Sequence, residues 1–243
     1  MGNLLSERLK VDTQLVSQAL NGASTPIYYN MKKYRKALLV WEIGAMAAAA
    51  TSVGAAWEAR DDAATGAQAL GAITATITAN TGVAEATLTL VTVLVGDTVT
   101  VNGLVYTAAA APDLPNRVFD QSGADAADAA SLVLALNHVT AGVPGVLAVD
   151  AGGGVINLVA NELGEMNITA TSVGGTITIA TVRAVGYLEV DHTMMTKATA
   201  LVAAYTHIGF IITNSAGMQT GAVVLRGNNR YTPTQYVAAA DTA

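Results

Sequence analysis

The 243-residue sequence predicts a mainly β protein: a jelly-roll or β-sandwich host domain, a small inserted α+β domain and an N-terminal helix. Three observations support this fold class. Short segments rich in Val, Ile and Thr recur along the chain between turns that contain Gly and Asn. Outside the middle of the chain these strands number about six to eight, which suits a two-sheet sandwich or jelly roll. Helical spacing of apolar residues is confined to two segments, and the acidic residues are concentrated in the middle.

The distribution of charge predicts where the domains begin and end. Residues 84–183 contain two basic and nine acidic residues, a net charge of −7, whereas the whole chain carries −6. A sustained change in charge density indicates a domain boundary, and insertions usually enter a host at an exposed loop tip. The predicted domains are a helical arm (1–26), a discontinuous jelly-roll host (27–83 plus 184–243) and an inserted acidic α+β domain (84–183). One continuous β domain with uneven charge is the alternative.

The composition narrows the class of protein. Only 12% of the residues are charged and 5% are aromatic, although 52% are hydrophobic, whereas an average soluble domain has about 25% charged residues. Such a surface suits a protein packed against copies of itself; a stable monomer with a weakly charged surface is the alternative. The negative charge argues against a nucleic-acid partner. No uncharged run is apolar enough to predict a membrane-spanning helix.

Residues 3–20 predict an amphipathic helix, because Leu5, Leu9, Val16 and Leu20 recur at roughly helical spacing. The Asn-Gly pair at 21–22 is a plausible end of that helix. A single helix needs a surface on which to dock. It either covers its own sheet or contacts a neighbouring subunit, and the sequence leaves both choices open.

Residues 27–36 contain four cationic residues and three tyrosines. Such a cluster is typical either of nucleic-acid contact or of a solvated turn, or salt-bridging contact, at the start of a strand. The second interpretation is favoured because no other basic cluster extends a groove. An apolar run then predicts that Trp41 is buried in a strand. The strands predicted for the host are 37–43, 55–61, 73–78, 186–190, 207–213 and 222–231, followed by a frayed tail at 237–243.

The acidic segment predicts three hairpins and one helix. Asn102-Gly103 predicts a type I′ turn within 98–107, because both residues accept a positive φ. Ser122 and Asp125 have the spacing of a capping box ahead of a helix at about 124–138. The other predicted hairpins pair 146–149 with 155–159 and 168–171 with 176–179, which gives one helix packed on one face of an antiparallel sheet.

No motif for catalysis, metal binding or cofactor binding is found in the sequence. The chain has no cysteine, and none of its three histidines has partners at metal-ligand spacing; Asp191-His192 lacks a further ligand. The sequence therefore predicts a protein that is not an enzyme, with no catalytic residues, no metal and no cofactor.

Two short stretches resemble a family of tailed-bacteriophage virion proteins. Residues 28–40 match its Tyr-x-x-Met-Lys-x-Tyr segment ahead of the first strand, and residues 221–233 match its Arg-Gly-x-x-Arg-Tyr-x-Pro segment at the last strand. The segments at 101–107 and 125–132 look like a module repeated in phage head and tail proteins. The resemblance implies a jelly-roll structural component, often a capsid decoration (cement) protein, whereas the inserted domain departs from the compact family pattern.

The resemblance implies a homotrimer on the capsid exterior that binds the major capsid protein and copies of itself, without nucleic acid or membrane. The expected contact residues are Leu5, Leu9, Val16, Leu20, Tyr28, Tyr34, Arg226 and Arg230. A tail or head–tail adaptor protein is one alternative. A carbohydrate-binding module on the virion surface is an alternative of another class. It would need exposed aromatic side chains, for which Trp57 is the candidate.

Overall fold

The computed structural model describes residues 9–47, 49–79, 83–161, 166–197 and 203–229, and it is mainly β, with 61% strand and 9% helix. A large antiparallel sheet and a small second sheet make up the strands, consistent with a β-sandwich. The chain divides into two compact units. Unit 1 comprises Met1–Glu42, Ser52–Thr76 and Gly186–Ala243, and unit 2 comprises Ile43–Thr51 and Ile77–Val185.

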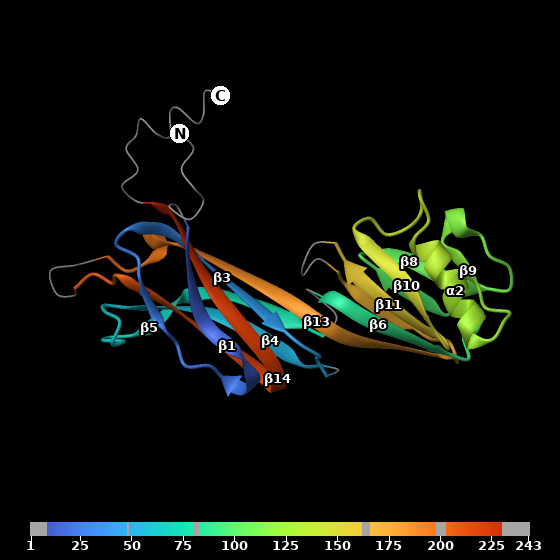
Figure 1. Ribbon diagram of the computed structural model, residues 1–243, viewed down its shortest axis with the longest axis horizontal. Helices are drawn as coiled ribbons and strands as arrows, with labels where there is room; N and C mark the ends of the chain where they lie inside the picture. The colour runs from blue at the N-terminus through green and yellow to red at the C-terminus, as the bar shows by residue number, and fades with distance from the viewer. Residues whose placement is uncertain (1–8, 48, 80–82, 162–165, 198–202, 230–243) are drawn as a thin grey trace, which may run out of the picture. The chain divides into compact units, whose positions relative to one another are not determined.

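Unit 1 is built around β14, a strand of 23 residues (Figure 1). Its neighbours in the sheet are β3 and β4, and β1 and β2 also pair with it, so that four strands pair with this one. The segment from His207 pairs antiparallel with β4, and the segment from Thr213 to Arg226 pairs antiparallel with β1. The elements are β1 (Lys10–Ala23), β2 (Tyr28–Asn30), β3 (Tyr34–Ile43), β4 (Thr51–Ala59), β5 (Gln68–Thr78), the end of β13 (Thr176–Asp191), η2 (His192–Met194) and β14 (His207–Asn229).

The strands predicted at 207–213 and 222–231 are one strand as far as Asn229, and the prediction of two was wrong. The polar stretch between them resembles a turn in the sequence, and β14 is irregular there. The pairing advances two residues along β1, from Leu20 to Gly22, but four along β14, from Met218 to Asn214. Asn214 Nδ2 donates to Thr220 Oγ1 (2.8 Å), and both residues are buried. This hydrogen bond joins two residues six positions apart, so the chain bends between them.

The N-terminal helix predicted over 3–20 is also wrong for the described residues, because residues 10–23 form β1. Of these fourteen residues only Gln14 is buried, so the Leu and Val side chains do not form an apolar helix face. The residues of β1 obtain their backbone partners from β14, with three register shifts along the pairing. A long neighbouring strand therefore overrides the weak helical periodicity of this segment.

Trp41 is fully buried in unit 1, as the apolar run predicted. Its indole Nε1 donates to Ser52 Oγ at 3.2 Å. Two glycines, one on β4 and one on β13, make room for the ring. A Cβ on Gly54 would lie 2.9 Å from Trp41 Cη2, and one on Gly186 would lie 2.5 Å from Cε2, closer than carbon atoms can pack.

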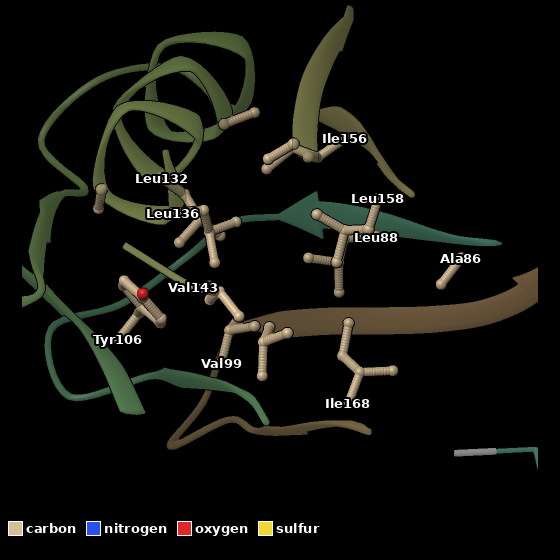
Figure 2. Packing of buried hydrophobic residues seen from close by; sticks show 14 of the residues in the cluster. Ala86, Leu88, Val99, Tyr106, Leu132, Leu136, Val143, Ile156, Leu158 and Ile168 are labelled. Carbon is tan, nitrogen blue, oxygen red and sulfur yellow. The ribbon is translucent and has the colours of Figure 1, made fainter. Parts of the chain in front are cut away.

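Unit 2 has two sheets and one helix. In one sheet the strand order is β10 (Val146–Gly152), β11 (Val155–Ala160), β6 (Val83–Val91) and the first part of β13; in the other it is β12 (Ile168–Thr171), β7 (Thr98–Val101), β8 (Leu104–Ala109) and β9 (Val118–Asp120). Helix α2 (Asp125–Leu136) and the short η1 (Leu114–Asn116) complete the unit. Figure 2 shows Leu132 and Leu136 of α2 lying in the same apolar interior as Tyr106 and Val99.

Two of the three predicted hairpins are confirmed in unit 2. Asn102 and Gly103 have φ of 50° and 79° between β7 and β8, and β10 pairs with β11 across residues 152–154. The third hairpin is wrong, because β12 pairs with β7 while β13 pairs with β6. The buried carboxylate of Asp97 accepts hydrogen bonds from the backbone N–H groups of Leu94 and Val173, and so holds the loop between β12 and β13 beside another loop.

The capping box at Ser122 and Asp125 is not formed. The N-cap residue of α2 is Ala124, which makes no side-chain capping bond. The Asp125 carboxylate instead accepts from the backbone N–H of Thr92, and Asp128 accepts from the backbone N–H of Gly123. Carboxylates at this end of a helix are favoured by the helix dipole whether or not they cap it, and here they join α2 to the neighbouring loops.

The limits of unit 2 differ from the boundaries predicted from charge. Unit 2 begins at Ile77 and ends at Val185, against the predicted 84 and 183, and it also includes Ile43–Thr51. Within that added segment Met46 forms an isolated antiparallel bridge with Thr181. The segment is rich in alanine and uncharged, so the charge pattern held no signal for it. That unit 2 is an inserted domain able to fold alone stays a prediction.

A candidate interface and its arginine cluster

The residues expected to make contacts lie in three different environments. Leu5 and Arg230 lie outside the described residues. Tyr28 and Arg226 are buried inside unit 1, so their side chains contact their own chain and not a partner. This corrects their assignment as direct contact residues. Tyr28 fills the space above Gly209 of β14, where a Cβ would lie 2.7 Å from the tyrosine ring. Val16 is exposed, and Leu9, Leu20 and Tyr34 are half-buried.

Arg226 joins four strands of unit 1. Its Nε donates to Asp12 Oδ2 at 2.8 Å, and its Nη2 lies 2.7 Å from the same oxygen. Its Nη1 donates to the backbone oxygen of Asn30 at 2.6 Å. The guanidinium carbon lies 4.7 Å from the centre of the Tyr34 ring and 5.4 Å from that of Tyr29. We call Asp12, Tyr29, Asn30, Tyr34 and Arg226 the arginine cluster.

The arginine cluster links the two sequence stretches that suggested a family. The stretch at 221–233 supplies the cation, Arg226. The stretch at 28–40 supplies the backbone carbonyl of Asn30 and the rings of Tyr29 and Tyr34. A planar guanidinium can stack on aromatic rings and bond to oxygen at its edges at the same time, which an ammonium cannot do. No sequence pattern pointed to Asp12 as a partner of Arg226, because it lies within the segment predicted as a helix.

Tyr29 closes one side of the cluster. Its hydroxyl donates to the backbone oxygen of Thr13 in β1 at 3.0 Å. Burial raises the pKa of Tyr29 to about 12, with a further increase from the Asp12 carboxylate and an opposing decrease from Arg226. The phenol therefore remains a neutral hydrogen-bond donor across the physiological pH range, and it fastens β1 to β2.

The basic segment at 27–36 forms salt bridges within the chain. Arg35 Nε lies 3.2 Å from Asp191 Oδ2, and Lys36 Nζ lies 2.6 Å from Glu189 Oε1. The two acidic residues lie on β13. The backbone hydrogen bond from Thr193 and, less strongly, Arg35 lower the pKa of Asp191. Two of the four cations are thus paired on the protein's own surface, in keeping with the favoured salt-bridging interpretation, although the partner is this chain itself.

Strand β1 carries exposed residues on both of its faces, among them the predicted contact residue Val16. Val11 and Val16 are 60% and 73% exposed, and residues 16–19 are all exposed. Among the described strands, β14 is the one with which β1 pairs. Figure 1 shows β1 lying along β14. We call the exposed residues of β1 (Val11 and residues 16–19) the β1 surface.

The other chemistry considered in the sequence lies elsewhere. His192 Nδ1 is 3.2 Å from Asp191 Oδ1, but the described residues hold no group of three or more His, Cys, Asp or Glu side chains able to hold a metal. Trp57, the aromatic candidate for a sugar site, is half-buried in β4. No helix within the described ranges is long and apolar enough to cross a membrane. No protein-family profile, curated protein or solved structure matches the chain.

Proposed function

We propose that the chain is a structural virion protein of a tailed bacteriophage that decorates and stabilises the capsid shell. Unit 1 would be the jelly-roll domain of this protein, assembled as a homotrimer that binds the major capsid protein on the capsid exterior. The protein would then act by binding alone. Weak contacts repeated by symmetry add up to a large binding free energy, which helps the shell resist the pressure of the DNA inside it. The resemblance of the two stretches that meet in the arginine cluster supports this proposal.

The observation that carries the proposal is the β1 surface. Exposed valines on a strand at the edge of a sheet are unfavourable in water and available for pairing with another chain, so proteins usually cover or charge such strands. In the described part of β1, Lys10 and Asp12 are the charged residues, and Asp12 is engaged by Arg226. The uncharged stretch from Thr13 to Ala23 therefore suits a contact with a second copy of the chain.

The contact can be tested with a charge placed on this surface. We expect Val16→Asp to leave the fold intact, because the side chain is exposed, while weakening both the trimer and binding to undecorated shells. The matched control is Val139→Asp in unit 2, which is 94% exposed and far from β1 in the sequence. Light scattering after gel filtration gives the oligomeric state, and co-sedimentation gives shell binding. Unchanged assembly and shell binding by the folded Val16→Asp protein would reject the role of β1.

The position of the protein on the virion distinguishes a capsid decoration protein from a tail or head–tail adaptor protein. Immunogold electron microscopy of virions, with antibody raised against the full chain, should label the whole head. Label confined to the tail or neck would favour the tail or head–tail adaptor protein. Absence of label from intact and from disrupted virions would reject a virion protein of any kind.

A further inference from the structure

Unit 1 contains a hollow of about 330 Å³ between three segments of chain. One wall is the turn after β2, the second runs from η2 to Lys197, and the third leads into β14. The backbone N–H of Met31 donates to Thr206 O at 2.9 Å, and that of Tyr205 donates to Thr196 O at 3.2 Å. These hydrogen bonds between the walls fix their spacing, so the hollow is formed before any ligand arrives.

Two of the side chains that line the hollow carry positive charge. They are Lys32 and Lys197, and the described lining residues include no carboxylate. Neither lysine ammonium forms an ion pair with a described residue. In a chain with a net charge of −6, two unpaired lysines at one hollow indicate a site for an anion.

The two acidic side chains beside the hollow are already engaged. Asp191 accepts from the backbone N–H of Thr193 at 2.9 Å and from Arg35 Nε at 3.2 Å. Glu58 is buried, and its carboxylate accepts from Thr196 N at 2.7 Å, from Gln68 Nε2 at 2.7 Å and from the Thr196 hydroxyl. Because these carboxylates are occupied by other donors, they are poorly placed to neutralise the two lysines.

The rest of the lining is suited to a polyhydroxylated ring. Hydroxyl groups without a partner among the described residues come from Thr193 and Tyr205, since the hydroxyls of Thr196 and Thr206 already donate to Glu58 and to the backbone oxygen of Arg60. Met31 and Met195 are buried lining residues that add a small apolar surface. A simple inorganic anion would use the lysines but neither the apolar surface nor most of the hydroxyls. The volume lies near the lower limit for ligand pockets, about 300 Å³, and so fits a ligand of monosaccharide size.

We propose that this hollow binds a monosaccharide that carries one anionic group, a carboxylate or a phosphate. Lys32 and Lys197 bind the anionic group, the hydroxyls of Thr193 and Tyr205 bond to the sugar hydroxyls, and the methionines contact the edge of the ring. Such a site would let the protein attach to an acidic glycan at a surface. It does not depend on the proposed virion role.

The test uses the full chain and the methyl NMR signals of its seven methionines. We expect glucuronate or glucose-6-phosphate to shift the signals of Met31 and Met195 in a saturable way, while Met46 and Met166 of unit 2 remain unchanged. The two acidic sugars distinguish a carboxylate from a phosphate. Neutral glucose and inorganic phosphate are the controls, and each should bind at least about tenfold more weakly, since each lacks one part of the recognised chemistry.

Lysine variants test which residues bind the anionic group of the sugar. Lys32→Ala and Lys197→Ala should each weaken binding of the acidic sugar about tenfold or more, as expected for a charge-assisted contact. Lys33→Ala is the matched control, because Lys33 is exposed in the same turn but is not among the described lining residues. The proposal is overturned by the absence of saturable shifts up to about 20 mM, where a Kd of about 1 mM would be nearly saturated. It is equally overturned by glucose or phosphate binding as tightly as the acidic sugars.

Discussion

Replacing Arg226 by methionine tests whether the arginine cluster holds β1 in place. The substitution keeps much of the side-chain volume and removes the charge. The Arg226 side chain is 5% exposed, and its partner Asp12 is 16% exposed, so the variant leaves a largely buried carboxylate without its closest cation. The backbone oxygen of Asn30 also loses its donor, and the rings of Tyr29 and Tyr34 lose the cation stacked on them.

The expected loss of unfolding free energy follows from the burial of the Arg226–Asp12 ion pair. Removing one partner of a buried ion pair costs about 3–5 kcal/mol, because the remaining charge is desolvated and unpaired. Lys10 Nζ lies 3.4 Å from the other Asp12 oxygen and compensates in part from the surface. We therefore expect Arg226→Met to lower the free energy of unfolding of unit 1 by about 3 kcal/mol, near the lower limit of that range.

Urea unfolding followed by tryptophan fluorescence measures this loss in unit 1. The chain has two tryptophans, Trp41 and Trp57, and both belong to unit 1, so their emission reports on that unit. The matched control is Arg35→Met, which removes a cation that is 59% exposed and also paired with an aspartate. Exposed ion pairs contribute about 0–1 kcal/mol, so the control should be nearly neutral.

A double variant separates the charge from the packing. Asp12→Asn combined with Arg226→Met removes both charges, and it should be more stable than Arg226→Met alone because no carboxylate is left buried without a cation. If Arg226→Met costs no more than Arg35→Met, the arginine cluster does not stabilise unit 1 and the reasoning fails.

Three further predictions concern other parts of the chain. Asp97→Asn should speed hydrogen exchange of the Val173 amide markedly, because a neutral amide oxygen is a weaker acceptor than a buried carboxylate; unchanged exchange would contradict the loop-holding role. Gly186→Ala should destabilise unit 1 by about 1–3 kcal/mol by overpacking against Trp41, seen as a lower urea midpoint. Because the pKa of Tyr29 is raised from 10.0 to about 12, its contribution to stability is present below pH 10 and is lost as pH rises toward 12. The loss, roughly 2–3 kcal/mol, should be absent in Tyr29→Phe when urea unfolding is compared at both ends of that range.

Local patterns in the sequence were enough to predict the β class and several elements. The positive φ at Asn102 and Gly103 depends on two adjacent residues, so their turn could be predicted without knowledge of the rest of the chain. The burial of Trp41 followed from the apolar run around it. The existence of α2 was predicted with limits correct to within two residues, because a helix makes its hydrogen bonds within its own segment.

The tertiary structure decided which segments became neighbours. Residues 10–23 have a helical apolar period, yet they form β1 because β14 offers a strand along which to pair. The strands β12 and β13 are separated by a short turn, yet they join different sheets. Asp12 and Arg226 are 214 positions apart, and their contact depends on the register of β1 on β14. Strand pairing satisfies backbone groups across the whole chain, and side-chain patterns within one segment do not specify which distant strand will do so.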